Sequence, residues 1–155
     1  MAHLYLLENW NIKLSINTAP GGTAAYSALS AGIDNMQEAL NEIVQQYHFF
    51  ADEGFGRSRV TAEQPVWTFS GRRIWGDAAQ EYIFGQKYKL GNERETDAKV
   101  EFTANGYNYT ITFDCTIANI QELGGATEEN SAISFEIHVD GKPTVTKSAV
   151  TPGTP

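Results

Sequence analysis

The sequence predicts a mainly β protein with one short helix. Three observations point to this fold class: long stretches in which apolar and polar residues alternate, an Asn-Gly dipeptide between two such stretches, and one helix with a capping signal. Alternation with a period of two is typical of a strand that buries one face, because successive side chains of a strand point to opposite sides. The 155 residues suffice for one domain with a hydrophobic core.

The strongest strand signal lies in the second half of the chain. Segments 99–104 and 107–117 flank Asn105-Gly106, a dipeptide that favours the two positive φ angles of a type I′ hairpin turn. The second segment alternates without a break over eleven residues, which is long for a strand. Two shorter strands are predicted earlier in the chain, at 11–17 and, after a proline, at 66–70.

A second hairpin is predicted after a polar loop at 123–130. The alternation resumes from Ile133 to Val139 and stops at Asp140-Gly141, which has the same turn chemistry as Asn-Gly. We therefore expect a turn there and a short strand around Val145. Residues 148–155 are small and include proline, which predicts a flexible C-terminal tail after a single domain at 1–147.

One helix is predicted at 78–85. Asp77 can accept a hydrogen bond at its N-terminus, and Gln80 stands where a capping box requires it. The expected buried face comprises Ala79, Tyr82, Ile83 and Phe84. Segment 33–47 is ambiguous, because its apolar residues recur at near-helical spacing whereas 43–50 could also extend as a strand.

Composition argues against several classes of function. With 19 acidic and 11 basic residues, the net charge of −8 disfavours a protein that grips phosphates, since nucleic-acid affinity comes mainly from Lys and Arg. No apolar run is long enough for a membrane-spanning helix, and the opening residues lack the features of a signal peptide. The single cysteine, Cys115, is expected to be a buried apolar residue in a reducing compartment.

No catalytic constellation is found. The three histidines lack metal-ligand spacing, and neither a nucleophile elbow nor a phosphate-binding loop is present. We therefore expect no enzymatic activity, no cofactor and no metal. Arg72-Arg73 is the only compact basic spot, and a salt bridge or an interface contact explains it best. The three tryptophans, Trp10, Trp67 and Trp75, are expected in the core or in subunit packing.

A series of features in the middle of the chain resembles a known family. They are Gly32-Ile33, Asn41-Glu42, the Ala51–Gly56 turn, Val60–Gln64, the strand Trp67–Gly71, Gly76–Gln80 with Tyr82-Ile83, Gly91 and Arg94. In these features the segment from about Gly32 to Arg94 resembles the tail tube (major tail) proteins of long-tailed bacteriophages, especially those infecting Gram-positive bacteria. Looser similarity in the closing strands extends the resemblance to about two thirds of the chain.

The resemblance implies a β-sandwich of two antiparallel sheets with one flanking helix. Six copies would form a ring in which the inner sheets of neighbours join into a continuous barrel, and stacked rings would form the tube through which DNA leaves the capsid. It also implies a virion location after assembly in the host cytoplasm. The implied partners are further copies of the chain, the tape-measure, terminator and distal tail proteins, and DNA that passes without specific binding. No membrane insertion is expected.

The resemblance also assigns expected roles to residues. Candidate lumen-facing acids, which would repel DNA phosphates, are Glu38, Glu42, Glu101 and Asp114. Candidate subunit-interface residues are Phe55, Arg72, Arg73 and Trp75. Contacts between rings are expected from the loops 51–59 and 18–30 and from both chain ends. The family has extended chain where 33–47 lies, which favours a strand at 45–50 and leaves 33–40 open.

Two alternatives remain at this point. The chain could be another tail component on the same fold, such as a tail terminator or the inner tube of a contractile system. It could instead be a β-sandwich module that binds carbohydrate through Trp67 or Trp75.

Overall fold

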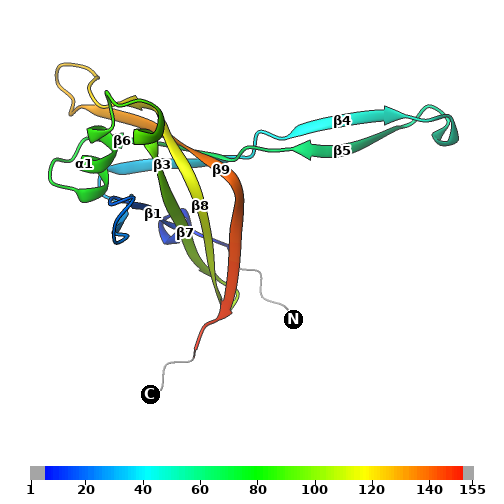
Figure 1. Ribbon diagram of the computed structural model, residues 1–155, viewed down its shortest axis with the longest axis horizontal. Helices are drawn as coiled ribbons and strands as arrows, with labels where there is room; N and C mark the ends of the chain where they lie inside the picture. The colour runs from blue at the N-terminus through cyan, green and yellow to red at the C-terminus, as the bar shows by residue number, and fades with distance from the viewer. Residues whose placement is uncertain (1–5, 152–155) are drawn as a thin grey trace.

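The body of the protein is one curled antiparallel sheet, seen in a computed structural model that describes residues 6–151. Its seven strands lie in the order β2 (Tyr26–Ala28), β1 (Lys13–Asn17), β7 (Glu95–Ala104), β8 (Tyr107–Gln121), β9 (Ala132–Ala149), β6 (Val66–Arg72) and β3 (Ile33–Ala39). Strands β4 (Ile43–His48) and β5 (Gly56–Ala62) form a second sheet, which projects from the body as a long hairpin (Figure 1).

One α-helix, α1 (Ala78–Gly85), closes one end of the body on the side away from the projecting hairpin (Figure 1). Residues 6–151 also contain three short 3-10 helices: η1 (Asn9–Asn11), η2 (Phe50–Asp52) and η3 (Gly91–Arg94). The mainly β fold with one flanking helix is confirmed. The layers that enclose the core all belong to the single curled sheet. The second sheet is the β4–β5 hairpin, which projects from the body.

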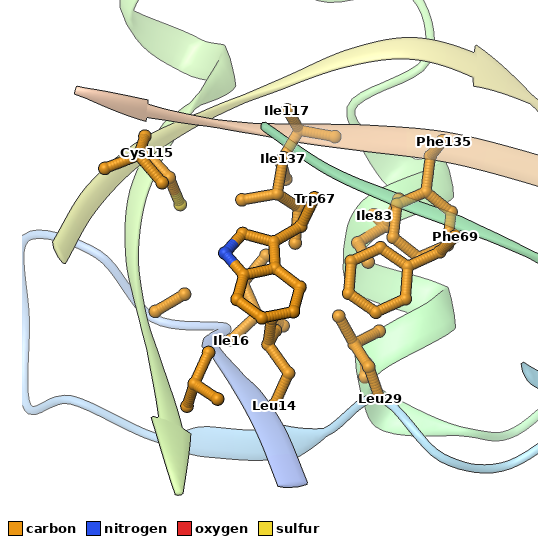
Figure 2. Close-up of a cluster of buried hydrophobic side chains, with 14 of the residues drawn as sticks. Leu14, Ile16, Leu29, Trp67, Phe69, Ile83, Cys115, Ile117, Phe135 and Ile137 are labelled. Atoms are coloured by element: carbon orange, nitrogen blue, oxygen red, sulfur yellow. The ribbon is translucent and has the colours of Figure 1, made fainter. Parts of the chain in front are cut away.

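The core forms where the sheet curls over its own apolar face and over α1 (Figure 2). Phe69 of β6 and Phe135 of β9 stack with ring centroids 5.0 Å apart, and Phe84 of α1 meets Phe135 edge-on at 6.1 Å. Both arrangements are favoured for aromatic pairs. Trp67 and Cys115 are also buried here, as expected, and burial raises the pKa of the Cys115 thiol.

The first predicted hairpin is confirmed. Asn105 and Gly106 have φ angles of 50° and 78°, and β7 pairs with β8 on either side of them. The two strands extend further from the turn than the alternation alone indicated. The predicted strands at 11–17 and 66–70 correspond to β1 and β6, although β1 begins only at Lys13, after η1.

The second predicted hairpin is wrong. Strand β9 runs without a turn from Ala132 through Asp140-Gly141 to Ala149. Its pairing with β8 shifts register between Thr112 and Asp114, and Gly141 has a φ of 77°. The positive φ therefore serves a β-bulge. Because β8 is long enough to pair with β9 on both sides of this bulge, β9 bends but continues as one strand and does not reverse direction (Figure 1).

The ambiguity at 33–47 is resolved in favour of strands. The near-helical spacing was misleading, since 33–39 forms β3 and 43–48 forms β4. A strand over 45–48 is confirmed, whereas Phe50 begins η2. The predicted flexible tail is wrong at Ser148 and Ala149, which pair with β8. Residues 152–155 of that predicted tail lie outside the described residues.

The predicted helix is confirmed, but only half of its capping box forms. The Asp77 carboxylate accepts a hydrogen bond from the backbone N–H of Gln80 at 3.1 Å. The Gln80 side chain does not return to Asp77 and instead bonds to neighbouring loops. Ala79, Ile83 and Phe84 are buried as predicted, Tyr82 is half-buried, and Gln80 is fully buried.

Candidate assembly surfaces

One face of the three longest strands is polar along its length. Directly opposite one another on β7, β8 and β9 lie Asp97, Asp114 and Asp140. Like charges at directly opposite positions destabilise a sheet. An aligned row of three aspartates therefore does not help an isolated subunit to fold, which makes this polar face a candidate functional surface.

Hydrogen-bond donors hold two of these carboxylates. Asp97 accepts bonds from the Tyr26 hydroxyl and from Asn17 Nδ2, the latter at 2.8 Å. The bond to Asp97 raises the pKa of Tyr26 to about 12, because it favours the protonated phenol. Asp140 accepts a bond from the Thr116 hydroxyl at 2.6 Å. Two of the three aspartates of the row are thus held in place by hydrogen bonds within the subunit.

The polar face continues on β9 with a further anion. Glu136 accepts a hydrogen bond from Asn119 Nδ2 at 2.7 Å and lies 2.8 Å from His138 Nε2. These contacts, first the bond from Asn119, lower the pKa of Glu136. Glu136 therefore stays ionised around neutral pH, and the negative charge extends along the face.

The structure brings together two of the four acids predicted to face a lumen. Glu101 and Asp114 both lie on the polar face of β7 and β8. Glu38 pairs with Trp67, so it lies on the opposite face of the sheet, at the edge strand β3. Glu42 lies in the connection between β3 and β4. The four acids therefore do not form one surface.

Sequence reasoning missed other acids of the polar face, namely Glu95, Asp97, Glu136 and Asp140. A usable signal existed for one of them. Counting outward from the Asn105-Gly106 turn places Asp97 opposite Asp114, as observed. The acids of β9 could not be found in this way, because the bulge at Gly141 changes the register.

The β4–β5 hairpin, which we call the arm, is exposed on both faces. Near its tip, Phe49, Phe50 and Phe55 expose 53%, 106% and 77% of their surface. A bidentate pair between Arg57 and Asp52, with both distances 2.6 Å, braces the tip. A lone two-stranded hairpin is at best marginally stable in water, and exposed apolar clusters mark contact sites. The arm is a candidate contact surface, and predicted interface residue Phe55 lies on it.

The other predicted interface residues lie near α1. Arg72 is exposed and donates to the carbonyl of Asn130 at 2.7 Å, and Trp75 is 70% exposed. Arg73 must be corrected, because its side chain is only 3% exposed. Its guanidinium lies 3.1 Å from Glu81 and 3.4 Å from Glu122, which makes Arg73 a contact within one subunit.

The carbohydrate alternative loses part of its basis. Trp67 is 7% exposed, so its ring is not accessible to a sugar. One face of the Trp75 ring is covered by the Arg73 guanidinium, 4.0 Å from the ring centroid.

Several strand edges are open. Strand β6 pairs with β9 only as far as His138, so the segment 142–149 of β9 pairs only with β8 among the described residues. The outer edge of β3 has no partner strand within residues 6–151. Open edges with unpaired backbone groups are templates for another chain.

Within residues 6–151, no cluster of three or more His, Cys, Asp or Glu side chains could hold a metal ion. In the same part of the chain, no helix has the length and apolar character needed to cross a membrane.

Comparison with solved structures identifies the fold. A chain in the tail of an empty gene transfer agent (GTA) particle, solved with C6 symmetry, matches at a TM-score of 0.70 and 11% identity. The match covers 91% of this chain and 99% of the other. A chain in the virion of the native GTA particle matches at a TM-score of 0.69 and 9% identity, with the same coverage. No family model and no curated protein matches the sequence.

The likeness spans nearly the whole of both chains, so the protein has the same fold as these two chains of the GTA particle.

Proposed function

We propose that this chain is a structural, non-enzymatic tail subunit of a phage-like particle, and that six copies form a ring that stacks into a tube for DNA. The observation that carries the proposal is the whole-length fold match to a chain from a C6-symmetric tail. Its location would then be the virion tail, where the ends of the tube would contact the tape-measure, terminator and distal tail proteins.

Ring closure is supported by the open strand edges. In an isolated subunit, the edges of β3 and of residues 142–149 in β9 have no partner strand among the described residues. A cyclic arrangement in which neighbouring sheets join would satisfy backbone groups of every copy, and closure would stop further growth of the sheet.

The polar face is proposed to line the lumen. It carries the aligned aspartates 97, 114 and 140 together with Glu101 and Glu136. These acids outnumber the lysines of the same face, which include Lys13 and Lys99. A lumen of net negative charge repels phosphates, so DNA passes without being held. Of the four acids predicted from sequence, Glu101 and Asp114 keep this role in the proposal.

The arm is proposed to contact the next ring. Its residues are exposed on both faces, and no other part of residues 6–151 covers its apolar tip. Stacked rings would cover it.

The proposal is tested by size-exclusion chromatography and negative-stain microscopy of the purified chain over a range of concentrations. We expect rings with six-fold symmetry that stack into hollow tubes. A chain that remains monomeric at high concentration would contradict the proposal. Closed rings that never stack would instead favour a tail terminator, the alternative component on the same fold.

A further inference from the structure

A second exposed apolar surface lies beside α1, which we call the α1-end surface. Its members are Trp75, Tyr88, Leu90 and Leu123, with exposures of 70%, 89%, 81% and 65%. They come from three separate segments of the chain, namely the loop before α1, the loop after it and the loop between β8 and β9. A contiguous apolar surface of this kind is unfavourable in water and typically marks a contact with another molecule.

A network of ionic contacts joins these segments into one surface. The Arg73 guanidinium lies over the Trp75 ring and 3.4 Å from Glu122, the neighbour of Leu123. Glu122 in turn lies 3.8 Å from Lys87 Nζ, which is 5.2 Å from the centroid of the Tyr88 ring. The surface is therefore built by contacts within the subunit.

We propose that the α1-end surface receives the arm tip of a second copy of this chain. The inference rests on the proposed stacking of rings and specifies which surface of the next ring the arm contacts. Figure 1 shows the arm and α1 at opposite ends of the longest axis of the molecule. An arm-to-α1 contact is thus head-to-tail, and it propagates from copy to copy.

The area of the two surfaces fits a specific interface. The three phenylalanines of the arm tip and the four residues of the α1-end surface together expose on the order of 1,000 Å² of largely apolar surface. With the polar groups around them, this approaches the roughly 1,200–2,000 Å² of a specific interface. An arm-to-arm contact would bury the phenylalanines but would leave the α1-end surface bare.

Charge is complementary as well. Arg59 lies opposite Gln45 on the arm face that carries Tyr47, whose ring stacks on Phe49. Glu128 lies in the loop that contributes Leu123. Within residues 6–151, neither Arg59 nor Glu128 has an ion-pair partner. Docking of the arm would allow these two charges to meet.

Mixing two variants tests the contact. The arm variant F50A/F55A and the surface variant W75A/Y88A alter exposed side chains only, and circular dichroism checks that both stay folded. Each variant alone should fail to stack. An equimolar mixture should form stacks of two rings and no tubes, because the intact arm of one variant meets the intact surface of the other. A mixture that behaves like either variant alone overturns the inference.

A charge swap adds a second readout. We expect R59E alone and E128R alone to raise the concentration needed for stacking by about tenfold each, and R59E/E128R to recover most of the loss. The control R59E/E101R should not recover, because Glu101 lies on the polar face of β7 and not in the α1-end surface. The inference is overturned if stacking recovers in the control, or if it does not recover in R59E/E128R.

The two experiments also separate this inference from the proposed function. If the unmodified chain forms tubes and the mixture forms no two-ring stacks, the landing site is wrong and the tube proposal stands. If the unmodified chain forms neither rings nor tubes but the mixture forms a one-to-one dimer, the arm contact stands without the tube.

Discussion

At the scale of single residues, Gln80 shows how a polar side chain organises this fold. It is fully buried in α1, yet every polar atom of its amide has a partner. Its Oε1 accepts from the backbone N–H of Ile74 at 2.8 Å, and its Nε2 donates to the carbonyls of Ala31 at 2.8 Å and Arg72 at 3.1 Å. The side chain therefore fastens two loops to the helix, including the loop that presents Trp75.

Replacing Gln80 by leucine should destabilise the subunit by roughly 3 kcal/mol. The change keeps the volume similar but removes the partners of three part-buried backbone groups, and each loss costs about 1 kcal/mol, the low end of the range for a buried group. Thermal or urea unfolding measures the change. The matched control is Gln86→Leu, since Gln86 is also buried but its Oε1 has no hydrogen-bond partner. Equal losses in the two variants would show that the network around Gln80 contributes little.

At the scale of elements, the sequence predicted those strands that bury one face. Strands β6, β7 and β8 have a period of two because the core selects apolar residues on one side only, and β1 has the same period although its polar Ser15 and Asn17 are also buried. The arm is exposed on both faces, and β3 lies at a sheet edge, so neither carries that selection. Helical spacing could therefore arise there without a helix.

The two dipeptides that favour a hairpin turn adopt different structures, and the reason lies in the neighbouring strand and not in the dipeptides themselves. Asn105-Gly106 forms a turn, whereas Asp140-Gly141 forms a bulge, although Gly106 and Gly141 have nearly the same φ. The difference is the partner strand, because β8 continues past the bulge and offers pairing on both sides. Local chemistry predicts the positive φ, but only the neighbouring strand decides between turn and bulge.

Replacing Asn105-Gly106 by Ala-Ala should destabilise the β7–β8 hairpin by roughly 2–3 kcal/mol. Both residues have positive φ, a conformation that costs an alanine about 1–2 kcal/mol. Unfolding monitored by circular dichroism gives the value. Gly85→Ala is the control, because an added Cβ there meets nothing within 4 Å and φ is not positive. That variant should be neutral or slightly stabilised. Unchanged stability in Ala-Ala would show that this turn is not under the conformational constraint described.

At the scale of the whole molecule, four features that have no contact partner in one subunit lie on separate surfaces. The polar face, the arm, the open edges and the α1-end surface each lack a partner within residues 6–151. Sequence reasoning found the acidic character of the protein and the arm tip at Phe55. It could not sort acids by face, since the face of Glu38 depends on its pairing with Trp67 across β3 and β6.

The placement of the predicted acids on different faces of the sheet leads to a specific prediction for DNA passage. Reversing Glu101 and Asp114 to lysine places four units of positive change per subunit on the proposed lumen face. Tubes should still assemble, because neither side chain contributes to the core. DNA should then be retained, with binding that weakens steeply as salt is raised, because lysines near phosphates bind by counterion release.

Glu38→Lys with Glu42→Lys supplies the matched control, since it makes the same charge change away from the polar face. DNA binding to assembled tubes is measured by co-sedimentation at several salt concentrations, and DNA delivery by intact particles is measured in parallel. Retention in E101K/D114K but not in E38K/E42K supports a lumen lined by the polar face. Retention in E38K/E42K alone would place the lumen beside β3 and the β3–β4 connection, and the ring would then have to be built with the polar face of β7, β8 and β9 turned outward.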